Sequence, residues 1–393
     1  MKWVVNTGGI CSYLFYLFIS GANLNFYMST SFVSFLIIAV LVFNIPGKDK
    51  IEIQKGSLRS AYSDTRLFTD QEVLNIKLTG RLRDLFNDTK ENPGYHPLVL
   101  SYRGVDSSEV SITIKARTRG HFRKTMGDCS YPPVLLNFSK KNTPPNSIFA
   151  RQDKIKLVMP CRGDEYVIRE WLLYKLYNLV TPKSFRARLV RIELNDTQRK
   201  KKTDPFYGIL LEEEEQMAKR NKMVVINKPL QHMQQADHNS FLQMAVFEYL
   251  IGNTDWSVQY GQNIKLIAKD STAIPFTVPY DFDHAGLVNA PYALPAEELQ
   301  MRSVRERRYR GYCIADMKQF AETFALYNKM KNEIYKLYTS STLLDARYIK
   351  TAIQYLDEFY DTINNEKKIQ ADFGYPCDKN GTGNIIIKGL KDD

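Results

Sequence analysis

The spacing of apolar residues changes along this chain, and that change most constrains its fold. Residues 96–160 hold short apolar runs between turn signals, and alternation as in "SITIKAR" predicts β-strands. Residues 165–180 carry apolar side chains at helical spacing, and helical patterns dominate beyond residue 237. We therefore expect an α+β, two-lobed fold with one cleft, a strand-rich N-lobe at residues 75–225 and a helical C-lobe at residues 226–375.

Local patterns set several boundaries within this plan. The segments "ARLVRIEL" and "FYGILL" are predicted to pair as a hairpin around a charged loop. The helix in "NSFLQMAVFEYLIGN" is expected to begin at an Asn-Ser cap and to stop at Gly252. The glutamates at 212–215 are typical of a solvated first turn of a helix. The segments "QNIKLIA" and "IPFTVPY" are predicted to be short strands.

The N-terminal part of the chain has no charged side chain between Lys2 and Lys48. Its apolar run at residues 32–43 has the length of a signal-peptide core and is shorter than the roughly 20 apolar residues of a membrane crossing. We expect residues 1–47 to be a signal peptide or a membrane anchor, with Met28 as an alternative start and residues 48–74 as a linker. The protein would then be exported to the periplasm, the cell surface or the medium.

Cysteine usage agrees with export. Of the five cysteines, Cys11 falls in the leader, and the other four permit two disulfides, which persist in exported proteins. Cys129 precedes one predicted strand and Cys161 follows another, so the two approach each other if those strands pair. Four cysteines allow three pairings, and we expect at least one disulfide among Cys129, Cys161, Cys313 and Cys377, with Cys129–Cys161 favoured. Isolated buried thiols are the alternative.

The formal net charge of +11 is spread through the chain. It favours acidic partners such as phosphate groups, and we expect no nucleic-acid partner. The Arg-rich segment at residues 303–311 either binds an acidic substrate or forms a charged loop face. After the helical half, residues 376–393 are expected to form a polar tail.

Acidic and amide side chains flank neighbouring apolar runs in the second half. Asp255 lies in "GNTDW", Asn263 precedes a predicted strand, and Asp281 and Asp283 follow another in "DFDHAG". Phosphoryl transfer needs a carboxylate that orients the attacking hydroxyl, and an Asn and a second carboxylate that hold Mg²⁺. The chain supplies these types in that order. If the chain is extended after residue 281, Asp283 faces the same side as Asp281 and serves as a further ligand.

Several segments resemble, in order, the spore-coat-H (CotH) family of atypical kinases, which are distant relatives of protein kinases. The segments are "ARTRGHFRKT", "PPVLLNF", "YVIREWLLYKLYNLVTPKSFRARLVRIELND", "YGILLEEEE" and "GNTDW…QNIKL…PYDFDHAG". The resemblance implies a protein-kinase-like fold, the use of ATP with Mg²⁺ or Mn²⁺, and phosphorylation of Ser/Thr hydroxyls in a protein substrate. By that match Asp255 is the catalytic carboxylate, and Asn263 and Asp281 are metal ligands.

The nucleotide-contacting lysine is less directly matched, because "PPVLLNF" lacks the basic residue that the family pattern leads us to expect. Lys156 and Lys115 are the candidates, with Arg119 and Arg123 as phosphate-facing residues. Glu170 lies on the long predicted helix and is the expected partner of the lysine, as the corresponding glutamate is in kinases.

Three functions follow from these patterns. The first is an exported, metal- and ATP-dependent kinase. The second is a non-catalytic kinase-fold protein that binds a surface polymer or a partner protein. The third is a metal-dependent phosphohydrolase, but the sequence does not show the further His and Asp ligands that a two-metal site needs. The ordered Asp and Asn set favours the first over the second, because a binding scaffold does not need it.

Overall fold

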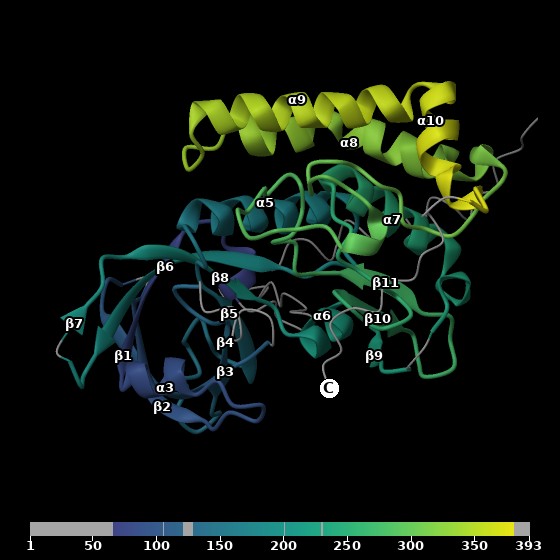
Figure 1. Cartoon of the computed structure of the whole chain (residues 1–393). Coiled ribbons are helices and arrows are strands. Elements are labelled where there is room, and N and C mark those ends of the chain that lie inside the picture. Colours follow the sequence, from purple (N-terminus) through teal and green to yellow (C-terminus); the bar gives the residue numbers. More distant parts are fainter. Residues whose placement is uncertain (1–65, 105, 121–128, 200, 229–230, 381–393) are drawn as a thin grey trace, which may run out of the picture. The chain divides into compact units, whose positions relative to one another are not determined.

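A computed structural model of the chain describes residues 66–104, 106–120, 129–199, 201–228 and 231–380 (Figure 1). The predicted leader, the first part of the predicted linker and Arg123 lie outside the described residues. None of the helices within these stretches has both the length and the apolar character that a membrane crossing requires.

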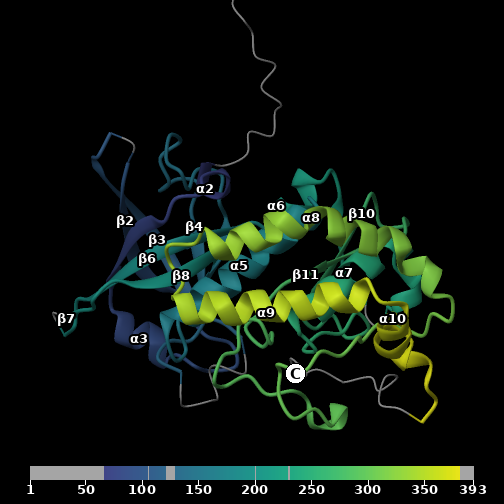
Figure 2. The same ribbon diagram turned by 90° about the horizontal axis from the view of Figure 1, so that it is seen from above.

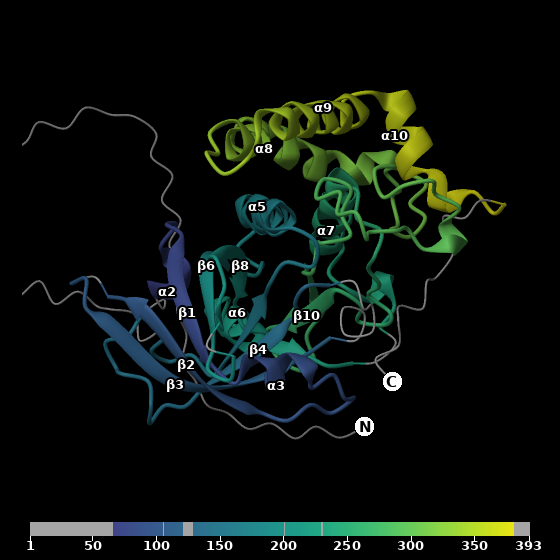
Figure 3. The same ribbon diagram turned by 60° about the vertical axis from the view of Figure 1, so that its left-hand side comes forward.

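Within the described stretches, seven strands close into one mixed β-barrel (Figure 3). The ring order is β1-β2-β3-β4-β5-β8-β6, and β6 pairs in turn with β1. The strands are β1 (Leu74–Gly80), β2 (His96–Arg103), β3 (Glu109–Thr118), β4 (Val134–Phe138), β5 (Lys154–Val158), β6 (Ala187–Asp196) and β8 (Phe206–Leu211). A short β7 (Lys201–Lys202) pairs with the far end of β6.

The expected two-lobed, protein-kinase-like fold is therefore wrong, because the strand-rich half closes on itself as a barrel. The closing contact is parallel and pairs Leu74 with Val190 and Gly80 with Asp196. The predicted antiparallel pairing of "ARLVRIEL" with "FYGILL" is confirmed, as β6 and β8. Local alternation can indicate such a hairpin, but it carries no signal for a parallel pair between strands that lie far apart in the chain.

The barrel interior is an apolar core. Along β3, the alternate residues Ile112, Ile114 and Ala116 are buried, as the two-residue period of a strand requires. The rings of Phe138 and Phe149 stack in the same core with their centroids 5.1 Å apart. The barrel thus encloses side chains contributed by its own strands and by the loop between β4 and β5.

The last part of the predicted linker packs into this core. Helix α2 (Arg66–Thr69) precedes β1, and its Leu67 is 1% exposed. Arg188 of β6 donates hydrogen bonds to the carbonyl oxygens of Leu67 and Asp70, at 3.4 and 2.8 Å. Residues 66–74 therefore belong to the folded domain.

The helices build a second core outside the barrel. α5 (Asp164–Val180), predicted from its spacing, is apolar on most sides because it lies between β8 of the barrel wall and helix α8. Figure 2 looks down on the helices and shows α8 and α9 running along each other in front of α5. The helices after β8 are α6 (Glu214–Arg220), α7 (His238–Ile251), α8 (Ala321–Thr339), α9 (Ala346–Ile363) and α10 (Glu366–Phe373), and α3 (Leu82–Asn87) follows β1. Short 3-10 turns are η1 (Met233–Gln235), η2 (Glu297–Leu299), η3 (Met317–Phe320) and η4 (Tyr375–Cys377).

Helix α7 ends as predicted and begins differently. Gly252 caps its C-terminus in the left-handed conformation, with φ of 71°. The N-cap is Asp237 rather than the predicted Asn-Ser pair, because the Asp237 side chain accepts from the backbone amide of Ser240. The predicted solvated glutamate turn is wrong for Glu212, which is 6% exposed and pairs with Arg220 at 2.9 Å.

Two disulfides join the four cysteines that lie within the described residues. The predicted Cys129–Cys161 bond is confirmed, and the antiparallel pairing of β4 with β5 accounts for its two half-cystines lying close together. The second bond joins Cys313 to Cys377. Disulfides of this kind are typical of an oxidising, extracytoplasmic compartment.

Candidate functional site

The small sheet beside α7 brings the predicted metal ligands together. Its strands β9 (Val224–Ile226), β10 (Ile264–Ala268) and β11 (Phe276–Pro279) are antiparallel, with β10 in the middle. Ile264 pairs with Pro279, so Asn263 and the Tyr280–Asp281 segment leave the sheet at the same end of β10 and β11. The backbone amide of Tyr280 donates to the Asn263 carbonyl oxygen at 3.0 Å.

The loop after α7 places Asp255 against Asn263. The Asn263 Nδ2 donates to the backbone carbonyl oxygen of Asp255 at 2.7 Å and to its carboxylate Oδ2 at 3.0 Å. Gln262 Nε2 donates to the other carboxylate oxygen, and Asn253 Oδ1 accepts from the Asp255 backbone amide at 3.1 Å. Asn263 therefore links the predicted catalytic carboxylate to the segment that carries Asp281.

Lys156 reaches this site from the barrel wall. Its neighbours Ile155 and Leu157 belong to the barrel interior, so strand alternation turns Lys156 to the outer face of β5. The Lys156 Nζ lies 2.9 Å from Asp281 Oδ2, and its side chain is 8% exposed. It also lies over the Tyr280 ring, 5.5 Å from the centroid. Of the two predicted lysines, Lys156 is the one that the structure brings to Asp281.

Tyr174 connects Glu170 to the same place. Its hydroxyl accepts a hydrogen bond from the Asp281 backbone amide at 3.0 Å and donates to Glu170 Oε1 at 3.5 Å. Glu170 is 1% exposed and lies one helical turn before Tyr174 on α5. The predicted nucleotide-site glutamate is thus joined to the predicted metal ligand through a tyrosine. We call the group formed by Lys156, Asp255, Asn263 and Asp281 the Asp255–Asp281 cluster.

Two members of the cluster have unusual backbone conformations. Asn263 and Asp281 have φ of 53° and 65°, in the left-handed region that is uncommon for residues other than glycine. Such conformations concentrate at functional sites, where the surrounding structure offsets their cost. The chain at Asp281 is therefore not extended, and the geometric premise that aligned Asp283 with Asp281 is wrong.

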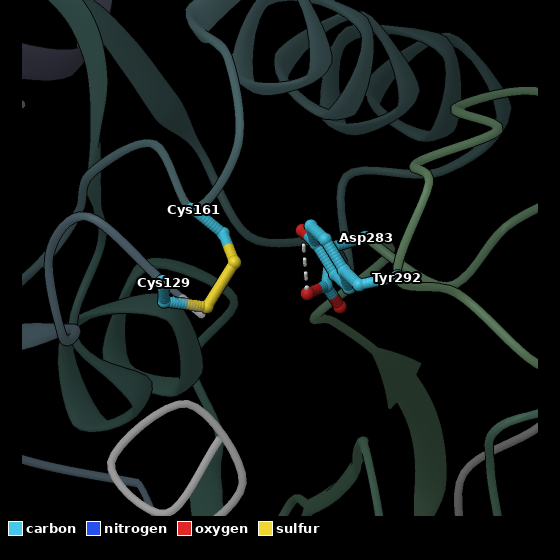
Figure 4. Close-up of a disulfide and its surroundings, with 4 residues drawn as sticks. All are labelled: Cys129, Cys161, Asp283 and Tyr292. Carbon is cyan, nitrogen blue, oxygen red and sulfur yellow. Dashed lines mark hydrogen bonds between the residues drawn. A yellow bond between two sulfur atoms is a disulfide. The ribbon is translucent and has the colours of Figure 1, made fainter. Parts of the chain in front are cut away.

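Asp283 lies in a more enclosed position. It is 8% exposed, and its Oδ2 accepts a hydrogen bond from the Tyr292 hydroxyl at 3.2 Å. Figure 4 shows this pair in the surroundings of the Cys129–Cys161 disulfide. The negative charge of the Asp283 carboxylate contributes to raising the pKa of Asp255.

Burial raises the pKa of Asp255 above the usual range of an aspartate. The nearby carboxylates Asp283 and Asp281 raise the pKa further, while His284 and Arg310 oppose the rise. A carboxylate in such surroundings is a better proton acceptor near neutral pH than an exposed aspartate.

Of the predicted phosphate-facing residues, only Arg119 lies within the described chain, and it is not bonded to the cluster. Arg119 follows β3, and its backbone amide donates to Pro133 at the end of the β3–β4 ladder. Within the described chain, no hydrogen bond or ion pair joins Arg119 to Asp255 or Asp281. Arg123 lies outside the described residues, and Lys115 is exposed on β3.

The donor set suits a cation that brings further ligands with it. In the part of the chain that is described, no group of three or more His, Cys, Asp or Glu side chains could hold a metal ion alone. Mg²⁺ commonly takes only one or two carboxylates from the protein and completes its shell with water and phosphate oxygens. The Asn263 amide and the Asp281 carboxylate fit such a shared site.

Three residues of the site were not predicted from sequence. Tyr174 follows Glu170 by four positions, which places both on one face of α5, and Gln262 directly precedes Asn263. Arg310 belongs to the Arg-rich segment, and the sequence indicated no role for it individually. The first two had a local spacing signal, whereas Arg310 had none.

A scan of the chain against protein-family models and a search of curated proteins gave no match, so the chemistry of this site is inferred from its residues and their geometry.

Proposed function

We propose that this protein is a phosphotransferase that uses ATP, with Mg²⁺ or Mn²⁺, to phosphorylate Ser/Thr hydroxyls of a protein substrate. The observation that carries the proposal is the convergence of Lys156 from the barrel wall with Asp281, and of Asn263 with Asp255, in one cluster. The motifs that resemble the CotH family support the same chemistry. The barrel lends no support, since it is not the fold that the resemblance implies.

Each residue of the cluster has a defined task in this proposal. Asp255 accepts a hydrogen bond from the substrate hydroxyl and directs it toward the γ-phosphorus. Lys156 offers its ammonium group to the phosphate oxygens, and Asn263 and Asp281 would hold the cation. When bound, the cation supplies positive charge to the phosphate oxygens as charge develops on them. Lys156 already pairs with Asp281, so nucleotide and cation would replace one ion pair with two separate contacts.

We also propose that the reaction takes place outside the cytoplasm. The support for this proposal is the two disulfides of the described chain, which are typical of proteins in an oxidising compartment. The protein substrate would then be exported as well, in the periplasm, at the cell surface or in the medium.

The direct test is metal-dependent nucleotide binding and transfer of labelled γ-phosphate. Wild-type protein should bind ATP by calorimetry only with Mg²⁺ or Mn²⁺ and should label itself or a generic protein. Asp281→Ala should weaken binding and transfer together, because it removes a ligand. Asp255→Asn should leave binding intact and lower transfer by about 10²–10⁴-fold, which is typical for a lost general base.

The matched control is Asp153→Asn, which changes an exposed aspartate just before β5 and should alter neither quantity. Asn263→Ala should behave as a milder Asp281→Ala. Wild-type protein without metal-dependent ATP binding would refute the phosphotransferase. Normal transfer by both aspartate variants would refute the assigned roles.

A non-catalytic binding protein is the second candidate. The observation that favours it is that both carboxylate oxygens of Asp255 already accept hydrogen bonds, from Gln262 and Asn263. In such a protein the cluster would only stabilise the loop after α7. Asp255→Asn would then change stability and leave partner binding unchanged.

A further inference from the structure

The Arg-rich segment at residues 303–311 is not a free charged surface. Three of its four arginines donate to backbone carbonyl oxygens in the segments that surround the Asp255–Asp281 cluster. The acceptors are Gly286 for Arg305, Leu250 for Arg307, and Thr254 and Trp256 for Arg310. Neither sequence-based reading, an anion-binding surface or a solvated loop, describes these contacts.

Arg310 makes the contacts closest to the proposed chemistry. Its side chain is 7% exposed, and its Nη1 donates to the carbonyl oxygens of Thr254 at 2.6 Å and Trp256 at 3.2 Å. The carbonyl oxygen between them, that of Asp255, accepts from Asn263 Nδ2 at 2.7 Å. Three consecutive carbonyl groups are therefore held by the side chains of Arg310 and Asn263.

We propose that Arg310 is a positioning residue, which fixes the loop on both sides of Asp255 so that the carboxylate faces the phosphoryl-transfer site. The inference rests on the proposed function and adds to it a residue that does not touch the substrate. A guanidinium group suits this task better than an ammonium group, because the two N–H bonds of Nη1 are fixed in one plane, whereas the N–H bonds of an ammonium group rotate.

The burial of Arg310 agrees with such a role. Placing a guanidinium group in the interior costs free energy unless charged or polar partners compensate for the lost water. Burial lowers the pKa of Arg310 to about 10, so the group still carries its charge at neutral pH. The negative charge of Asp255 opposes that lowering, because an opposite charge favours the ionised guanidinium group.

Steady-state kinetics of Arg310→Ala test the proposal. We expect kcat to fall by about 10²-fold, since a small displacement of a catalytic group has that effect, while the KM for metal–ATP stays unchanged. The KM should hold because Lys156 and Asp281 are untouched. Millimolar guanidinium ion, which can enter the space left by the side chain, should restore part of kcat. Arg310→Lys should be intermediate.

Hydrogen exchange supplies a readout that does not depend on activity. Amides of residues 253–258 should exchange faster in Arg310→Ala than in wild type. The matched control is Arg308→Ala, because Arg308 donates to Leu299 and Tyr375 instead. It should change neither kcat nor exchange in that loop.

The outcomes separate the two proposals. Unchanged kcat, or unchanged exchange at residues 253–258, in Arg310→Ala would overturn the positioning role. A fall in kcat that guanidinium does not restore, accompanied by a higher KM, would also overturn it, because it would indicate general loss of structure. If wild-type protein transfers no phosphate, the proposed function fails, and exchange alone decides whether Arg310 holds the loop.

Discussion

The barrel interior and the helical core differ in what they bury. The barrel encloses apolar side chains such as Leu100 and Ile155, both 0% exposed. The helical core also buries ionisable side chains, among them Glu170 and Glu248, each 1% exposed. Burying an ionisable group costs free energy unless hydrogen bonds or opposite charges compensate. The comparison indicates that the barrel contributes stability, whereas the helical side retains groups that stability alone would not select.

The largest effect is expected for a buried charge pair on the helical side. Arg220 of α6 donates to both carboxylate oxygens of Glu212, at 3.1 and 2.9 Å. Arg220→Ala leaves the Glu212 carboxylate buried without an opposite charge and with only the Arg186 backbone amide as a donor, so the free energy of unfolding should fall by about 3–5 kcal/mol. The adjacent Lys219→Ala removes only an exposed ion pair with Glu215 and should cost under about 0.5 kcal/mol. If urea unfolding gives the same loss of unfolding free energy for both variants, the buried ion pair contributes no more than the exposed one.

A truncation inside the barrel should cost nearly as much. Leu100→Ala opens a cavity in the apolar interior and should lower the free energy of unfolding by about 2–5 kcal/mol. Val99 precedes it on β2 and is 37% exposed, so Val99→Ala should cost under about 1 kcal/mol. Nucleotide binding by folded Leu100→Ala protein should match wild type. Weaker nucleotide binding at a temperature where the variant is fully folded would contradict the inference that the barrel interior contributes stability and not binding.

The pH dependence of stability sharpens the comparison on the helical side. Burial raises the pKa of Glu248 well above its usual value of 4.5. Above pH 4.5 the unfolded chain releases this proton while the folded protein keeps it, so the free energy of unfolding falls as pH rises. Glu248→Gln removes this titration and should flatten the decline, with no difference from wild type at lower pH. Glu333→Gln, an exposed change on α8, should leave the decline unaltered. An unchanged slope in Glu248→Gln, measured by urea unfolding from pH 4 to 9, would contradict the prediction.

The smallest effect is the difference between the two disulfides. Cys129–Cys161 closes a separation of 32 residues and Cys313–Cys377 one of 64. Each doubling of loop length adds about 0.6 kcal/mol of closure entropy, so replacing the second pair by alanine should cost about that much more than replacing the first. Thermal unfolding of the two double variants measures the difference. A larger loss from the Cys129–Cys161 pair would indicate that this bond stabilises the folded state by more than loop closure.

Local sequence patterns determined much of this protein. The spacing in residues 165–180 predicted α5, Gly252 predicted the end of α7, and the pairing of two apolar runs predicted Cys129–Cys161. The order of Asp255, Asn263 and Asp281 indicated a site, and the short β10–β11 hairpin is enough to bring the last two together. These features depend on residue periodicity and short loops, which a sequence shows directly.

The tertiary structure decided the barrel and the surroundings of the site. The parallel β1–β6 pair, the contact of Lys156 with Asp281 and the hydrogen bonds of Arg310 to the Asp255 loop all join residues far apart in the chain. Many alternative partners are compatible with the same local pattern, since alternation specifies which face of a strand is buried and not which strand lies beside it. Closure of the sheet depended on the packing of the whole domain, and so did the choice of the lysine that meets the carboxylates.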